Sequence, residues 1–116
     1  MSLRLTSDLW VQAYLRQCRS DGSFGYLANR GSEAAGAIFI KIVQPSGQVD
    51  LYGPAPQSIV TDEQLDRDSR LFEFIQSGQD SDIDAKLNSE RKFDPDIWIV
   101  EIEDAKGCHR LALAKT

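Results

Sequence analysis

Side chains that commonly perform acid/base or nucleophilic chemistry are scarce in this sequence. His109 is the single histidine, and it follows Cys108, one of the two cysteines. The pattern predicts a strand over residues 108–114, where adjacent side chains point to opposite faces, so Cys108 and His109 cannot form a nucleophile and base pair. Cys18 could approach His109 only through the tertiary fold. We therefore predict an edge-strand histidine, buried thiols and no catalytic residue, which favours a protein that is not an enzyme.

Two carboxylates, Glu101 and Glu103, form the best pair for contacting a ligand or a cation. In a strand they share one face, roughly 7 Å apart by the strand rise, within reach of one cation or of a water between them. A solvated strand face explains them more simply. The aspartates at 80, 82 and 84 fit the start of a helix, and no segment has the spacing of a calcium-binding loop. We predict no metal and no cofactor.

Motifs that mark nucleotide, zinc or hydrolase chemistry are absent from the sequence. It contains no GxxxxGK phosphate loop, no GxGxxG, no HExxH, no paired CxxC and no GxSxG. The best-known active sites for nucleotide, zinc and hydrolase chemistry are therefore excluded, but other kinds of enzyme are not.

The composition narrows the function classes further. The chain has 116 residues, 41% of them hydrophobic, which fits one domain over residues 1–116 with its own core. Its net charge of −5 repels phosphates, so we expect no nucleic acid and no anionic membrane as a partner. No run approaches the roughly 20 apolar residues of a membrane-spanning helix, and the first residues lack a secretion signal. We expect a cytoplasmic protein with reduced cysteines.

The elements that must position these groups begin with a helix from about residue 8 to 20. Thr6 or Ser7 can cap its start. Its apolar residues recur at the spacing that lines one helix face: Val11, Tyr14, Leu15 and Cys18. Further along, residues 62–76 fit both the helix and the strand period, and we favour a strand over 70–76.

A second helix is predicted after residue 80. Ser81 and Asp84 form a capping-box pair at its start, and Pro95 ends the segment, because the residue before a proline avoids helical geometry. The remaining short runs alternate with period two and predict strands over 24–30, 38–43, 49–52, 97–103 and 108–114. The turns "QPSGQ" and "DAKG" join the second to the third and the fourth to the fifth of these strands as hairpins.

This order of elements predicts an α+β fold, an antiparallel β-sheet of hairpins packed with two helices in a single compact domain. Aromatic residues on the strands could in principle stack on bases, but the acidic charge favours their assignment to the sheet's core. The residues concerned are Phe24, Tyr26, Phe39 and Tyr52.

The stretch "DLYGPAPQS" follows a predicted strand with two prolines. Pro54 and Pro56 hold the loop extended and remove amide donors, so a purely structural role is one interpretation. The other is partner docking, because a rigid loop with Tyr52 at its root and Gln57 at its end loses little entropy on binding. Tyr52, Pro54, Pro56 and Gln57 are therefore the candidate partner-binding residues.

Four segments together carry a family resemblance: "RLTSDLWVQAYLRQC", "GAIFIKI", "DLYGPAPQ" and "FDPDIWIVEIED". In these segments and in their order the chain resembles a small bacterial family, the domain of unknown function 1491. The resemblance runs from Arg4 to about Leu111. It implies a bacterial cytoplasmic domain and brings no activity, cofactor or site.

Two function hypotheses follow. The first is a non-catalytic interaction module, which could be a homodimer, that binds a protein partner through a sheet face or the loop from Tyr52 to Gln57. The alternative is a small-molecule-binding protein or small enzyme that uses the carboxylates of Glu101 and Glu103. Such a site requires a concave pocket in which a few polar groups converge.

Overall fold

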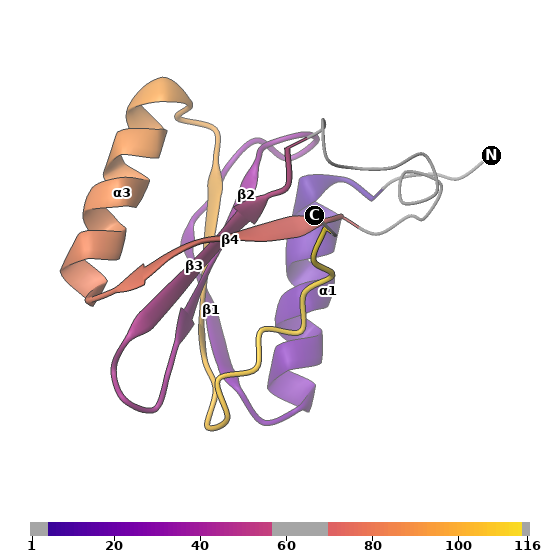
Figure 1. Ribbon diagram of the computed structural model, residues 1–116. Helices are drawn as coiled ribbons and strands as arrows, with labels where there is room; N and C mark the ends of the chain where they lie inside the picture. Colours follow the sequence, from indigo (N-terminus) through magenta and orange to yellow (C-terminus); the bar gives the residue numbers. More distant parts are fainter. Residues whose placement is uncertain (1–4, 57–69, 115–116) are drawn as a thin grey trace.

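A computed structural model describes residues 5–56 and 70–114 of the chain. In these residues a five-stranded sheet lies between two helices (Figure 1). The elements in chain order are α1 (Ser7–Ser20), β1 (Phe24–Asn29), β2 (Ile38–Val43), β3 (Val49–Pro54), β4 (Phe72–Gly78), α3 (Asp80–Phe93) and β5 (Trp98–Glu103). This arrangement confirms the predicted α+β fold.

The spatial order of the strands is β1-β5-β2-β3-β4. Neighbouring strands are antiparallel except for β2 and β5, which run parallel with Ile38 opposite Trp98 and Ile42 opposite Ile102. The connection between these two strands contains β3, β4 and α3, as a parallel pair requires a long crossover. The sheet is therefore mostly antiparallel, with one parallel pair at its centre.

Local sequence signals place most of these elements where they were predicted. The Thr6 side chain accepts a hydrogen bond from the amide of Leu9 and caps α1. Gly47 takes a positive φ of 92° in the turn between β2 and β3. Of residues 62–76, those from Phe72 onward form β4, as favoured, and 62–69 lie outside the described residues.

The capping box of helix α3 lies two residues earlier than predicted. Gln79 is the N-cap, and its side chain and that of Asp82 form the capping box, in place of Ser81 and Asp84. Asp84 is instead free to reach the sheet, as described below. No helix in the described part of the chain is long and apolar enough to cross a membrane.

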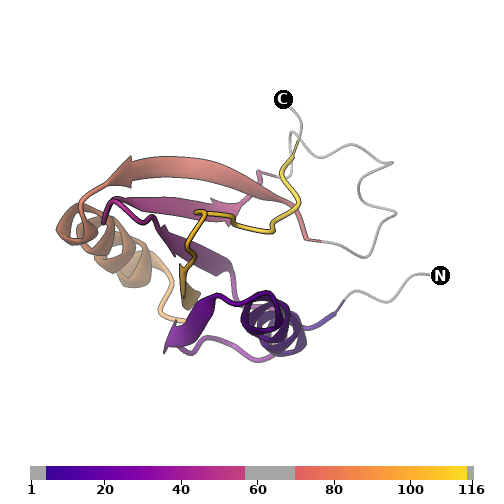
Figure 2. The same ribbon diagram turned by 90° about the horizontal axis from the view of Figure 1, so that it is seen from below.

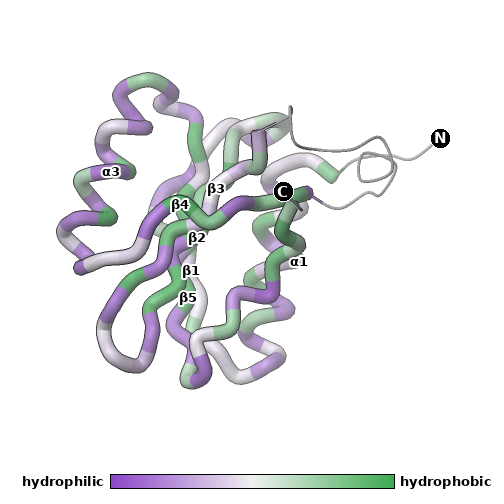
Figure 3. Tube along the Cα trace, in the orientation of Figure 1, coloured by the Kyte–Doolittle hydropathy of each residue, from purple (hydrophilic) through white to green (hydrophobic). Residues whose placement is uncertain are grey.

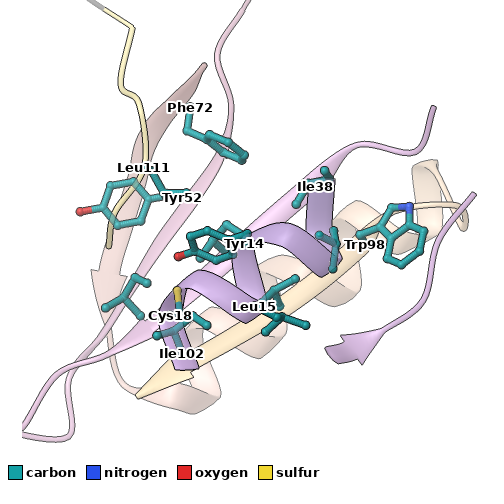
Figure 4. Packing of buried hydrophobic residues seen from close by; sticks show 13 residues of the cluster. Tyr14, Leu15, Cys18, Ile38, Tyr52, Phe72, Trp98, Ile102 and Leu111 are labelled. Atoms are coloured by element: carbon teal, nitrogen blue, oxygen red, sulfur yellow. The ribbon is translucent and has the colours of Figure 1, made fainter. Parts of the chain in front are cut away.

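The two faces of the sheet carry separate cores. On one face α1 packs Val11, Tyr14, Leu15 and Cys18 against strand residues that include Ile102 and Trp98 (Figure 4). On the other face Ile83 and Leu87 of α3 pack against Phe39, Val49, Leu51, Ile97 and Ile99. Hydrophobic residues accordingly concentrate along the strands between the helices (Figure 3). The period-two pattern of the sequence explains both cores, because successive strand residues point to opposite faces.

The segment after β5 corrects the predicted return strand over 108–114, and it corrects the prediction of two buried thiols, because Cys18 is buried but Cys108 is exposed. Residues 104–107 do form the expected turn, but the following chain crosses the α1 side of the sheet without strand pairing, except for one bridge between Leu113 and Phe72 (Figure 2). Asp104 causes this departure, because its side chain accepts hydrogen bonds from the amides of Lys106 and Cys108. Arg110 has a positive φ of 56°, which a strand does not tolerate.

Candidate functional site

A row of polar side chains crosses three adjacent strands on the α3 side of the sheet. Lys41 of β2 lies opposite Glu101 of β5, which lies opposite Tyr26 of β1. The two oxygens of Glu101 are shared between its neighbours: Oε1 lies 3.0 Å from the Lys41 Nζ, and Oε2 accepts a 2.6 Å hydrogen bond from the Tyr26 hydroxyl. Strand register alone is therefore sufficient to assemble this row.

Helix α3 adds two further carboxylates to Lys41. Asp80 and Asp84 stand one helical turn apart, and each places Oδ1 at 2.9 Å from the Lys41 Nζ. The Lys41 side chain is only 5% exposed, so it depends on these partners. The sequence signal for this contact is the lone lysine in the apolar run "IFIKIV", since a lysine in a buried strand requires a partner.

The charges of this row determine what chemistry it can do. Burial lowers the pKa of Lys41, but its hydrogen bonds with Asp80, Asp84 and Glu101 outweigh that effect and leave the pKa well above its usual value. The hydrogen bond to Glu101 raises the pKa of Tyr26 to about 12. Lys41 is therefore a permanent cation and Tyr26 a neutral phenol, so neither is poised to act as a general base at neutral pH.

Glu103 shares the face of Glu101 but not its surroundings. Its side chain is exposed at the end of β5, whereas both oxygens of Glu101 already have partners. Within residues 5–56 and 70–114, no group of three His, Cys, Asp or Glu side chains could hold a metal ion. The two carboxylates thus share a face, and only Glu103 is open to solvent.

The outer part of this face, on β1, is not covered by a helix. Phe24 is 76% and Tyr26 is 50% exposed, because α3 packs over β3 and β4 and leaves the β1 edge open. This corrects the expectation that all strand aromatics belong to the core: Phe39 and Tyr52 are buried, whereas Phe24 and Tyr26 are not. We call Phe24, Tyr26, Ala28 and Glu103 the open face.

The described part of the proline loop, from Tyr52 to Pro56, comprises the end of β3 and the two residues after it. Tyr52 is buried, with its ring 4.8 Å from the ring of His109 and 5.7 Å from that of Phe74. Pro54 pairs with Phe72 in the β3–β4 ladder and is exposed, as is Pro56. Gln57 lies outside the described residues. Of the candidate loop residues, Pro54 and Pro56 therefore reach the surface, and Tyr52 belongs to the core.

His109 lies over Tyr52 on the α1 side of the sheet. Its Nδ1 accepts a 2.9 Å hydrogen bond from the amide of Leu111, and its carbonyl accepts one of 2.7 Å from the Tyr14 hydroxyl. Burial lowers the pKa of His109, against an opposing effect of Asp50. These contacts favour a neutral imidazole with its proton on Nε2, and they hold the C-terminal segment against the core.

A shallow hollow of about 250 Å³ lies on the flank of α1. Gln12, Leu15, Arg16 and Arg19 line it. It adjoins β1, because Arg19 donates to the Gly25 carbonyl at 2.8 and 3.2 Å. Gly25 also permits this close packing, since a Cβ there would lie 2.9 Å from Leu15. The hollow is therefore a basic feature beside the free edge of the sheet.

The fold and the polar row together define a small α+β domain in which most of the polar side chains described above form hydrogen bonds or salt bridges with one another. The model of the family described as "Protein of unknown function (DUF1491)" matches residues 5–112, and the chain therefore belongs to this family. No curated protein matches the chain.

Solved structures of similar proteins have the same fold. The solution structure of protein Atu0922 from A. tumefaciens is 41% identical, covers 98% of each chain and superimposes with a TM-score of 0.81. The crystal structure of a DUF1491 family protein from Caulobacter crescentus CB15 is 32% identical over 97% of this chain and 98% of that one, with a TM-score of 0.79. An NMR structure of a DUF1491 family protein from the same organism is 30% identical over 98% and 100%, with a TM-score of 0.78.

Proposed function

We propose that this protein is a non-catalytic interaction module that binds a protein partner through the open face. The observation that carries the proposal is the exposure of two aromatic side chains, Phe24 and Tyr26, on the same face of an edge strand. Aromatic residues are enriched at the energetic centres of protein interfaces. An exposed pair of this kind on a small domain is typical of an interaction surface.

The contacts around Tyr26 support binding rather than catalysis. Its hydroxyl is held by Glu101, which in turn is held by Lys41. An aromatic side chain fixed in this way loses little conformational entropy when a partner packs against it. The neighbouring carboxylate of Glu103 gives the rim of the surface a negative charge.

The proline loop remains a second proposed docking surface. Pro54 and Pro56 are exposed, and Phe74, which is half-exposed, lies against Tyr52. A second copy of the chain is one partner that either surface could accept, which would give a homodimer. The alternative function, a small ligand bound by Glu101 and Glu103, has weaker support because the oxygens of Glu101 are already occupied.

We also propose that the protein works in the bacterial cytoplasm. Similar structures come from two bacteria, A. tumefaciens and Caulobacter crescentus. Both cysteines are free thiols, which fits a reducing compartment.

Affinity capture from an extract of the cells that make the protein tests the main proposal. The wild type is compared with Phe24→Ser and with the control Phe93→Ser, which removes an aromatic side chain that is 90% exposed at the end of α3. We expect the same partner with the wild type and the control, and its loss with Phe24→Ser. Equal capture by all three proteins, or no specific capture, would overturn the proposal.

A further inference from the structure

We infer that the free edge of β1 accepts an extended segment of a partner protein in which acidic residues alternate with apolar ones. The inference rests on the proposed function and names the chemistry of the partner. Three features carry it: the backbone groups at the edge, two arginines on one side of the strand, and the aromatic pair on the other.

The backbone at this edge has the geometry for an added strand. Among the described strands, β1 pairs only with β5. The Gly25 carbonyl accepts from Arg19, so it points away from β5. In an antiparallel strand the N–H and C=O of one residue point the same way, and alternate residues repeat the direction. Gly25 and Leu27 therefore present backbone donors and acceptors to an incoming chain.

The α1 side of this edge carries positive charge that no described carboxylate offsets. Arg16 and Arg19 line the hollow, and no salt bridge joins either of them to a carboxylate within residues 5–56 and 70–114. The chain as a whole has a net charge of −5. Two guanidinium groups whose charge no described carboxylate offsets therefore attract acidic side chains to a surface that otherwise repels them.

Arg19 makes the edge selective. Its guanidinium holds the Gly25 carbonyl, the group that an incoming amide must occupy. A strand that displaces Arg19 must offer it a new acceptor, and a carboxylate on the α1 side provides one through a charge-assisted hydrogen bond. A strand without that carboxylate would leave Arg19 unpaired beside the interface, so the binding of such a strand is disfavoured.

The opposite side of the same edge requires apolar residues. Phe24 and Tyr26 point there, and the exposed carboxylate of Glu103 on β5 repels further negative charge. Side chains of an added strand alternate between the two sides with period two. One side then faces arginines and the other faces aromatic rings, so the complementary sequence alternates acidic and apolar residues.

The probe is a fluorescein-labelled peptide of alternating glutamate and valine, roughly eight residues long, the length of a typical strand. We expect its binding, followed by fluorescence anisotropy, to weaken by about tenfold or more in Arg16→Glu, because the reversed charge repels glutamate. Arg91→Glu is the matched control on the exposed side of α3 and should leave the affinity within about twofold. A peptide alternating lysine and valine should bind at least about tenfold more weakly than the glutamate peptide.

Amide hydrogen exchange separates strand addition from docking by side chains alone. With the glutamate peptide bound, we expect the Leu27 amide to become protected. No binding, equal binding of the lysine peptide, unchanged Leu27 exchange, or equal loss in both charge-reversal variants would each overturn the inference. Binding of a single-stranded oligonucleotide at comparable affinity, with the same dependence on Arg16, would replace it with a nucleic-acid site. If capture still depends on Phe24 when the peptide fails, the proposed function stands and only the partner's chemistry is wrong.

Discussion

Lys41 and Glu101 face each other on adjacent parallel strands, with the Lys41 Nζ 3.0 Å from Oε1 of Glu101. The same ammonium group binds Asp80 and Asp84 at the start of α3, and the same carboxylate binds the Tyr26 hydroxyl. One continuous chain of polar contacts thus ties α3 to the sheet and reaches the open face. The position of the helix and the orientation of Tyr26 are coupled through this pair.

Replacing Lys41 with methionine should destabilise the protein. The substitution keeps a similar length but leaves Glu101 without its counterion, and it frees Asp80 and Asp84 to repel each other. We expect a loss of about 2 to 3 kcal/mol in the free energy of unfolding, below the usual range for a fully buried pair because both aspartates are more than half exposed. Urea unfolding followed by circular dichroism measures the change.

The control for this prediction is Lys86→Met. Lys86 forms a surface salt bridge with Glu90 within α3, so its loss should cost less than about 0.5 kcal/mol. Equal stability of the Lys41 and Lys86 variants would mean that Lys41 does not hold α3 against the sheet.

The Tyr26 phenol should lose its proton at a higher pH than a tyrosine without a hydrogen-bonded carboxylate. Its pKa is raised from 10.0 to about 12 by the hydrogen bond to Glu101. The raised value means that the folded state retains this proton above pH 10, so the contribution of the contact to stability is complete below that pH and falls as pH rises toward 12. Ultraviolet difference titration of wild type against Glu101→Gln should show one tyrosine moving back toward 10.0 in the variant. Superimposable titration curves would contradict the contact.

Local patterns were sufficient to predict α1, the β2–β3 hairpin and the shared face of Glu101 and Glu103 on β5. In each case the signal is contained in a few consecutive residues, such as Val11 and Tyr14 on one helix face or Gly47 at a turn that needs a positive φ. The parallel pairing of β2 with β5 could not be predicted in this way, because hydrophobic alternation fixes the face of a residue and not the neighbour of a strand.

The candidate site was harder to predict for the same reason. The exposure of Phe24 and Tyr26 depends on which strands α3 covers, and that depends on tertiary packing. The segment from Cys108 onward alternates like a strand, but its first amide donates to the Asp104 side chain, and Arg110 turns the backbone. Side-chain bonds to the backbone overrode the local pattern there.

His109 should make the stability of the protein sensitive to mild acid. Burial lowers its pKa below 6.5, and protonation of Nδ1 would break the hydrogen bond from the Leu111 amide. Because the unfolded chain binds this proton more readily, the stabilising effect is complete above about pH 6.5 and is lost as pH falls toward the pKa of the folded protein. As the only histidine, His109 gives an unambiguous signal in a proton NMR titration.

The companion measurement is urea unfolding at about pH 7.5 and about pH 5. His109→Gln should lose less stability between the two pH values than the wild type does, because glutamine does not titrate. A histidine pKa at or above 6.5 would contradict the predicted burial effect.

Among the residues that hold the C-terminal segment, Asp104 should cause the largest loss of stability when it is substituted. Its Oδ1 accepts hydrogen bonds from the Ser23 hydroxyl and, at 2.9 Å, from Arg110, while Oδ2 accepts the amides of Lys106 and Cys108 at 2.9 and 3.0 Å. The hydrogen bond from Ser23, then that from the Cys108 amide, and those from Lys106 and Arg110 outweigh burial and hold the pKa of Asp104 well below its usual range. Asp104→Asn keeps the shape but removes the charge and turns one acceptor into a donor, so we expect a loss of about 2 to 4 kcal/mol.

Urea unfolding of Asp104→Asn beside Glu103→Gln tests this prediction. The neighbouring glutamate is exposed, so its neutralisation should change the free energy of unfolding by less than about 0.5 kcal/mol. Since the pKa of Asp104 is depressed in the folded protein, its contribution is present above the unfolded pKa of about 3.8 and is lost as pH falls below that value. The stability difference between wild type and Asp104→Asn should therefore shrink in strong acid. A difference that stays constant with pH would show that the charge of Asp104 does not hold the segment in place.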